Sequence, residues 1–125
     1  MINVIIGKRS NLTQKMLSML DNSLAISSSA IVKEMGSIDW KSHRVNLILN
    51  QFQPAEKLND LSAPIDYIDN AIDSTAKVLE FVKSESINVN KIIYTSSSSV
   101  YGNNKSCHEN DISAPISLHA ALKVA

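Results

Sequence analysis

The chain has 125 residues, 44% of them hydrophobic, so it can bury one core and is too short for two ordinary domains. Twelve lysine and arginine residues balance twelve aspartate and glutamate residues, so no net charge attracts DNA, RNA or an anionic membrane. Its one cysteine, Cys107, cannot form an internal disulfide, and its short apolar start matches neither a signal peptide nor a membrane span. We therefore expect a soluble, cytoplasmic domain with no nucleic-acid or membrane partner.

The chain opens with a strand pattern followed by a helix pattern. Residues 3–6 form an apolar run rich in β-branched side chains and end at Gly7, which is typical of a buried parallel strand. Apolar residues at helical spacing then predict a helix over residues 10–20. Asn11 and Gln14 resemble a capping box at the start of this helix.

The middle of the chain predicts two more strands. One covers residues 24–27 and runs into three serines, Ser27 to Ser29, and the other covers residues 45–49. Between these strands, a short helix is compatible with Ile31, Val32 and Met35, and Gly36 interrupts it. Residues 51–64 look like an irregular loop.

The longest predicted helix covers residues 65–85. One stripe of apolar side chains is expected to cover the sheet, with Ala76 between its members: Ile68, Ile72, Leu79 and Val82. Three further apolar residues lie beside this stripe and are expected to contact a partner: Ala71, Val78 and Phe81.

A further strand is expected over residues 91–96, after a turn bracketed by Asn88 and Asn90. Serines follow this strand, residues 100–115 look like a loop, and a last helix is expected to begin near Ser117 or Leu118. The chain ends inside this helix without a capping residue, so we expect a fragment or a truncated relict of a longer protein.

Alternating strand and helix patterns indicate an α/β fold with crossover connections and a parallel sheet. The two serine clusters, residues 27–29 and 96–99, follow predicted strands. Ligands of open α/β sheets bind at the carboxyl ends of the strands, so these serines lie where a ligand is expected.

The stretch from Lys91 to Gly102, with consecutive serines before Val100-Tyr101-Gly102, resembles the NAD-dependent epimerase/dehydratase family of extended short-chain dehydrogenases. In that family an acidic residue, a proline and then Tyr-x-x-x-Lys follow. Here the corresponding residues are Glu109, Asp111, Pro115 and the segment from His119 to Lys123. The resemblance implies a single Rossmann-like nucleotide-binding domain over residues 1–125, a parallel sheet flanked by helices that stops before the substrate-binding portion.

The resemblance also implies roles for individual residues. Ser97 matches the family's serine or threonine that hydrogen-bonds the substrate oxygen, and Lys123 matches the lysine that contacts the cofactor ribose and favours the tyrosinate. His119 stands where the family has its catalytic tyrosine. The positions that would lie against NAD or NADP are Gly7, Ser10, Asn11, Leu12, Ile48, Leu49, Asn50 and Lys123.

The histidine is the first departure from the family pattern. Lys123 would favour a phenolate, but it disfavours an imidazolium at His119, since like charges repel. A neutral imidazole still accepts a proton, so His119 is either a general base or a substituted residue with no catalytic role.

The other departures concern the cofactor. The family's Gly-x-x-Gly-x-x-Gly becomes Gly7, Ser10 and Thr13, which crowds the pyrophosphate and predicts that NAD or NADP binds weakly or not at all. No acid follows the strand at residues 24–27, where NAD-binding proteins place one for the ribose hydroxyls. Serines and Lys33 are compatible with a ribose phosphate, and so with NADP, but serines are equally ordinary loop residues.

His43 and His108 have no companions at metal-ligand spacing, so no metal site is expected. Trp40 is expected to be a packing residue.

The resemblance implies a nucleotide-sugar substrate for a full-length protein, and a homodimer through the helix at residues 65–85 and the one beginning near Leu118. The alternatives are an active NAD(P)-dependent epimerase, dehydratase or reductase, an inactive nucleotide-binding paralogue, and a dimerisation module.

Overall fold

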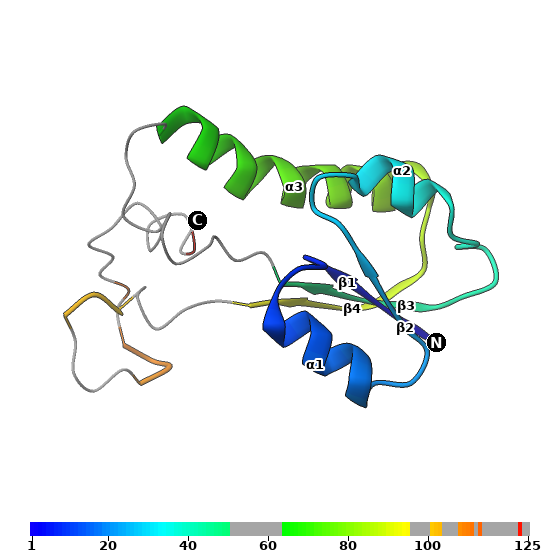
Figure 1. Cartoon of the computed structure of the whole chain (residues 1–125), viewed down its shortest axis with the longest axis horizontal. Coiled ribbons are helices and arrows are strands. Elements are labelled where there is room, and N and C mark those ends of the chain that lie inside the picture. The colour runs from blue at the N-terminus through cyan, green and yellow to red at the C-terminus, as the bar shows by residue number, and fades with distance from the viewer. Residues whose placement is uncertain (51–63, 96–100, 104–107, 112, 114–122, 124–125) are drawn as a thin grey trace. The chain divides into compact units, whose positions relative to one another are not determined.

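The computed structural model describes residues 1–50, 64–95, 101–103, 108–111, 113 and 123. Its elements in chain order are β1 (Ile2–Ile6), α1 (Asn11–Met19), β2 (Ser23–Ile26), α2 (Ile31–Gly36), β3 (Val45–Leu49), α3 (Pro64–Ser84) and β4 (Val89–Tyr94) (Figure 1). The chain forms two compact units, one of Met1–Phe52 with Ala71–Thr95 and one of Gln53–Asn70 with Ser96–Ala125. The first unit carries the whole described sheet.

The four strands form one sheet in the order β2-β1-β3-β4, and each neighbouring pair is parallel. This confirms the predicted parallel α/β fold, with strand boundaries shifted by one or two residues. The predicted turn bracketed by Asn88 and Asn90 is wrong, because β4 begins at Val89. Asn90 lies inside the strand, and its Nδ2 donates to Asn46 Oδ1 on β3 at 2.8 Å.

Helix α1 begins one residue away from the expected cap. Ser10 is the N-cap, with extended backbone (φ −71°, ψ 145°), and its Oγ accepts from Thr13 N at 3.0 Å. The predicted capping box at Asn11 and Gln14 is therefore wrong, since Asn11 already belongs to the helix. Gln14 instead donates from Nε2 to the carbonyl of Lys8 at 2.7 Å.

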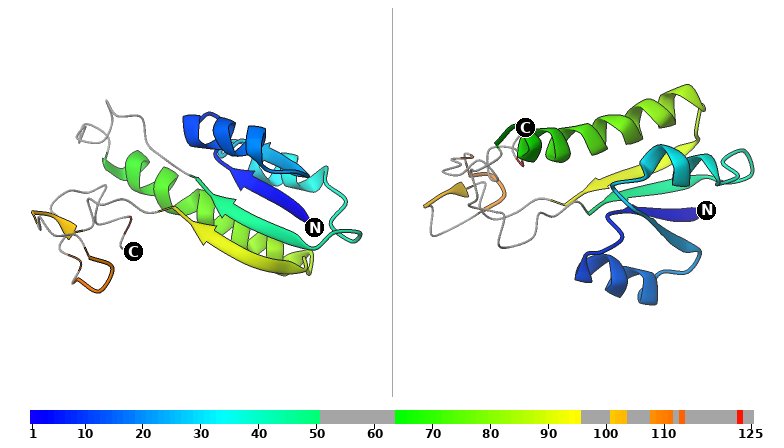
Figure 2. Two further views of the ribbon diagram at one scale, coloured as in Figure 1. Left: turned by 90° about the horizontal axis from the view of Figure 1, so that it is seen from below. Right: turned by 45° about the horizontal axis from the view of Figure 1, so that its top comes forward.

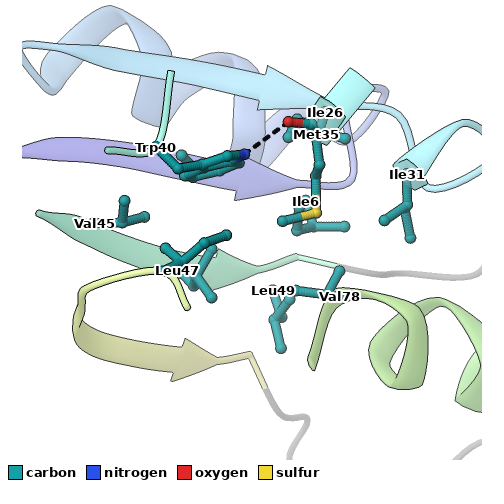
Figure 3. Close-up of a cluster of buried hydrophobic side chains, with 11 residues drawn as sticks. Ile6, Ile26, Ile31, Met35, Trp40, Val45, Leu47, Leu49 and Val78 are labelled. Atoms are coloured by element: carbon teal, nitrogen blue, oxygen red, sulfur yellow. Dashed lines mark hydrogen bonds between the residues drawn. The ribbon is translucent and has the colours of Figure 1, made fainter. Parts of the chain in front are cut away.

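Helix α2 and the part of α3 from residue 71 onward cover one face of the sheet, and α1 lies on the other face (Figure 2). The core lies between the sheet and α2 and α3 (Figure 3). Trp40 is 8% exposed, donates from Nε1 to the carbonyl of Met35 at 2.8 Å and lies 6.2 Å from the Phe81 ring. The predicted packing role of Trp40 is confirmed.

The inward face of α3 differs from the predicted stripe. Val78 is completely buried, and Phe81 and Val82 pack against the core. Ile68, Ile72 and Leu79 are 37%, 49% and 44% exposed. The reason is Ser74, which is buried four residues before Val78 and breaks the apolar periodicity of the inward face. Val78 and Phe81, assigned to a partner, thus pack in the core, whereas three of the four residues assigned to the sheet are exposed. Val82 packs as predicted, and the side chain of Ala71 lies outside the described residues.

Candidate functional site

The carboxyl ends of the strands bring four residues from separate parts of the chain to one edge of the sheet: Gly7, Ser27, Asn50 and Thr95. Backbone hydrogen bonds extend the ladder by one residue beyond the strands. Gly7 N donates to Ile26 O at 2.9 Å, Asn50 N to Ile6 O at 2.9 Å, and Thr95 N to Leu49 O at 3.2 Å. Ligands of parallel sheets bind at this edge, so it is the candidate site.

The turn after β1 presents the amino end of α1 at this edge. Gly7 has φ 111°, a conformation that a side chain would strain, so the first glycine of the family fingerprint is required by the backbone. Ser10 Oγ accepts from Thr13 N, whereas the N–H groups of Asn11 and Leu12 have no partner among the described residues. Free N–H groups at a helix amino end, with exposed Lys8 and Arg9 before them, suit an anion such as a phosphate.

Thr13 fills the place of the family's third glycine and is completely buried. Its hydroxyl donates to the carbonyl of Gly7 at 2.7 Å and accepts from Ser10 Oγ at 2.8 Å. Asn50 Nδ2 approaches the same hydroxyl at 3.4 Å. A glycine there normally allows close packing of helix and strand; here the threonine is accommodated by these bonds.

Leu49 and Asn50, both matched to the cofactor by the resemblance, are deeply buried. The Leu49 side chain belongs to the hydrophobic core, and its carbonyl accepts from Thr95 Oγ1 at 2.9 Å. Asn50 Nδ2 also contacts Met16 Sδ at 3.1 Å, while Asn50 Oδ1 has no hydrogen-bond partner in the described part of the chain. The Leu49 side chain thus contributes to the core, and Asn50 contacts Thr13 and Met16 of α1.

An acid does lie at the end of β2, which the sequence did not reveal. Glu34 reaches back from α2, and its Oε2 accepts from Ser27 N at 2.6 Å. Ser27 Oγ and Ser29 Oγ are 2.8 Å apart and share a hydrogen bond. No acid follows β2 directly along the chain, as the sequence shows, but the structure places the carboxylate of Glu34 at the end of this strand. The signal available beforehand was an acid on the short predicted helix that follows the strand.

Two of the residues matched to catalysis, Ser97 and His119, lie outside the described residues. Lys123 is half-buried, and this burial lowers the pKa of its ammonium group.

Within the described ranges there is no group of three or more His, Cys, Asp or Glu residues that could hold a metal ion. No helix among the described residues is long and apolar enough to cross a bilayer.

Comparison with known proteins agrees with this arrangement. A crystal structure of UDP-galactose 4-epimerase superposes with a TM-score of 0.72 at 18% sequence identity, which shows a shared fold. The alignment covers 100% of this chain and 48% of that one, so this chain spans about half the length of that solved structure. No curated protein matches. The model of the NAD dependent epimerase/dehydratase family matches residues 37–125, more than half of the chain, and the protein therefore belongs to that family.

Proposed function

We propose that this chain is the nucleotide-binding domain of an NAD(P)-dependent nucleotide-sugar epimerase or dehydratase of the cytoplasm, and that the 125-residue chain is itself inactive. One observation carries the proposal. At the carboxyl edge of a parallel sheet, the Gly7 turn leads into α1, whose Asn11 and Leu12 N–H groups have no partner among the described residues. This is the arrangement with which dinucleotide-binding folds hold a pyrophosphate.

The residues at the edge fit a dinucleotide, with one obstacle. Thr13 is accommodated within the structure, so the loss of the third glycine does not by itself displace a ligand. Ser10 replaces the second glycine, and its hydroxyl already engages Thr13 N. Asn11 and Leu12 would hold the pyrophosphate, with Lys8 and Arg9 adding positive charge. The nicotinamide, when bound, accepts a hydride from a sugar carbon.

We expect NAD and NADP to bind with dissociation constants well above the low micromolar range. The reason is that the Ser10 side chain removes one N–H group from the helix end and adds atoms where the backbone would approach the pyrophosphate. Isothermal titration calorimetry with each dinucleotide measures this. Ser10→Gly is expected to tighten binding. Ser86→Gly is the control for adding a glycine, because Ser86 is exposed in the turn before β4, with φ 51°, away from the carboxyl edge of the sheet. A low micromolar constant for the unaltered chain contradicts the expectation.

We expect no turnover of nucleotide sugars by the purified chain. His119 stands at the family's tyrosine position, and Lys123 does not favour its charged form as it would favour a phenolate. A missing general acid or base lowers the rate by about 10²–10⁴-fold. Chromatography of the sugar products after incubation with NAD tests this, with His119→Tyr as the variant that would restore the family residue. Epimerisation or dehydration by the unaltered chain, abolished by Ser97→Ala, would show that the proposal of inactivity is wrong.

A second candidate function is a non-catalytic dimerisation module, favoured by the outward face of α3. Ile72 and Leu79 lie two helical turns apart and are 49% and 44% exposed. A second copy of the chain is the proposed partner, as the family resemblance implies. Sedimentation velocity at micromolar concentration tests the assembly, and Leu79→Glu is the variant that should weaken it. A monomer whose sedimentation Leu79→Glu leaves unchanged would contradict this candidate.

A further inference from the structure

We infer that Glu34 is the residue that recognises the adenosine ribose of the dinucleotide and makes this chain select NAD over NADP. The inference rests on the proposed function, since it concerns the same edge of the sheet. It assigns to α2 a contact that the family resemblance places directly after β2, where this chain has only serines.

The position of Glu34 follows from the packing of α2. Ile31 and Met35 are buried in the core, at 2% and 0% exposure, and they fix the short helix beside the end of β2. Glu34 lies next to Met35 in the chain, and its carboxylate bonds Ser27 N, the first N–H group after β2. The end of β2 adjoins the Gly7 turn directly, because Gly7 N donates to Ile26 O at 2.9 Å.

Because the end of β2 lies beside the Gly7 turn, Glu34 would contact the part of the dinucleotide next to its pyrophosphate. In a dinucleotide-binding sheet, the pyrophosphate lies at the helix after β1, and the adenosine ribose lies over the end of the neighbouring strand, where an acid accepts from its hydroxyls. Here that neighbouring strand is β2, and Glu34 is the acid that the structure places at its end. The acid expected at the end of β2 is therefore supplied by a residue of the following helix, and not by the residues that directly follow the strand.

The chemistry of the carboxylate favours hydroxyl donors over a phosphate. A carboxylate can accept about four hydrogen bonds, and the backbone of Ser27 takes one of these, on Oε2. Oε1 has no partner among the described residues, so it can accept from the 2′- or 3′-hydroxyl. The 2′-phosphate of NADP brings negative charge to the same place, and like charges repel.

The nearby groups do not reverse this preference. Lys33 adjoins Glu34 in the chain, but neighbouring positions on a helix point in different directions. The hydroxyls of Ser27 and Ser29 bond each other and are less available to a phosphate. Lys8 and Arg9 lie in the turn before α1, where the pyrophosphate that both dinucleotides share is expected.

The test is calorimetry of the purified chain with NAD and NADP, repeated with AMP and adenosine 2′,5′-bisphosphate, which probe the adenosine half alone. We expect NAD to bind about tenfold more tightly than NADP, and AMP more tightly than the bisphosphate. Glu34→Gln keeps an oxygen for Ser27 N but removes the charge, and it should weaken NAD about tenfold and close the gap to NADP. Glu80→Gln, an exposed position on α3, makes the same change in net charge and should alter neither affinity.

Two outcomes separate this inference from the proposed function. If NADP binds as tightly as NAD or more tightly, or if Glu34→Gln leaves their ratio unchanged while circular dichroism shows a folded chain, dinucleotide binding stands and the role of Glu34 is overturned. The ratio for the unaltered chain decides the question even if the variant does not fold. If neither dinucleotide binds, even to Ser10→Gly, the proposed function fails and this inference fails with it.

Discussion

Val78→Glu is expected to unfold the unit that carries the sheet. Val78 is completely buried on the inward face of α3, packed against the core formed with β1 and β3. A carboxylate placed there without a partner costs several kcal/mol. That is comparable with the whole stability of a small domain, about 5–15 kcal/mol. Far-UV circular dichroism and urea unfolding should show a loss of cooperative structure at ambient temperature.

A second valine provides the matched control. Val32→Glu makes the same change on α2, where the side chain is 59% exposed, so the carboxylate stays in water. This variant should unfold at nearly the same urea concentration as the unaltered chain. If Val78→Glu instead stays folded and only dissociates an oligomer, Val78 is an interface residue, as the sequence pattern had indicated, and the described packing of α3 is wrong.

The two central strands, β1 and β3, could be predicted because consecutive residues in each are buried, on both faces of the sheet. Such strands read as short β-branched runs, as in residues 3–6 and 45–49, and their order along the chain implies parallel pairing. The faces of α3 could not be assigned in this way. Isoleucine and leucine occur on its outward side, and the inward side contains Ser74, so hydrophobicity alone selects the wrong stripe.

In the candidate site, too, only the features set by nearby residues in the chain could be predicted. Gly7 and the departures at Ser10 and Thr13 can be identified from their spacing after a strand. The bonds by which Ser10, Thr13 and Asn50 satisfy one another join α1 to β3, and no local pattern contains them. Glu34 was missed because it reaches the end of β2 from a later helix.

The amino-terminal turn, where two fingerprint glycines are replaced, also lies outside the family match. The match covers residues 37–125 and begins after α2, so the Gly7 turn lies outside it, whereas the structural alignment covers the whole chain. The fold of the first strand and helix is thus preserved although Ser10 and Thr13 replace two of the three glycines. The turn can keep this fold only if the side chains that replace the glycines find hydrogen-bond partners. The hydroxyl of Thr13 does so by donating to the carbonyl of Gly7.

Thr13→Val is therefore expected to destabilise the unit by about 2 kcal/mol, although it preserves the volume of the side chain. The variant leaves the carbonyl of Gly7 without its 2.7 Å partner and removes the acceptor of Ser10 Oγ and Asn50 Nδ2. Thr13→Ser keeps the hydroxyl and loses one methyl group, at a cost of about 1 kcal/mol. Urea unfolding followed by circular dichroism compares the two variants. A valine variant as stable as the serine variant, or more stable, would show that packing at this position matters more than the hydrogen bonds, and that the turn does not depend on them.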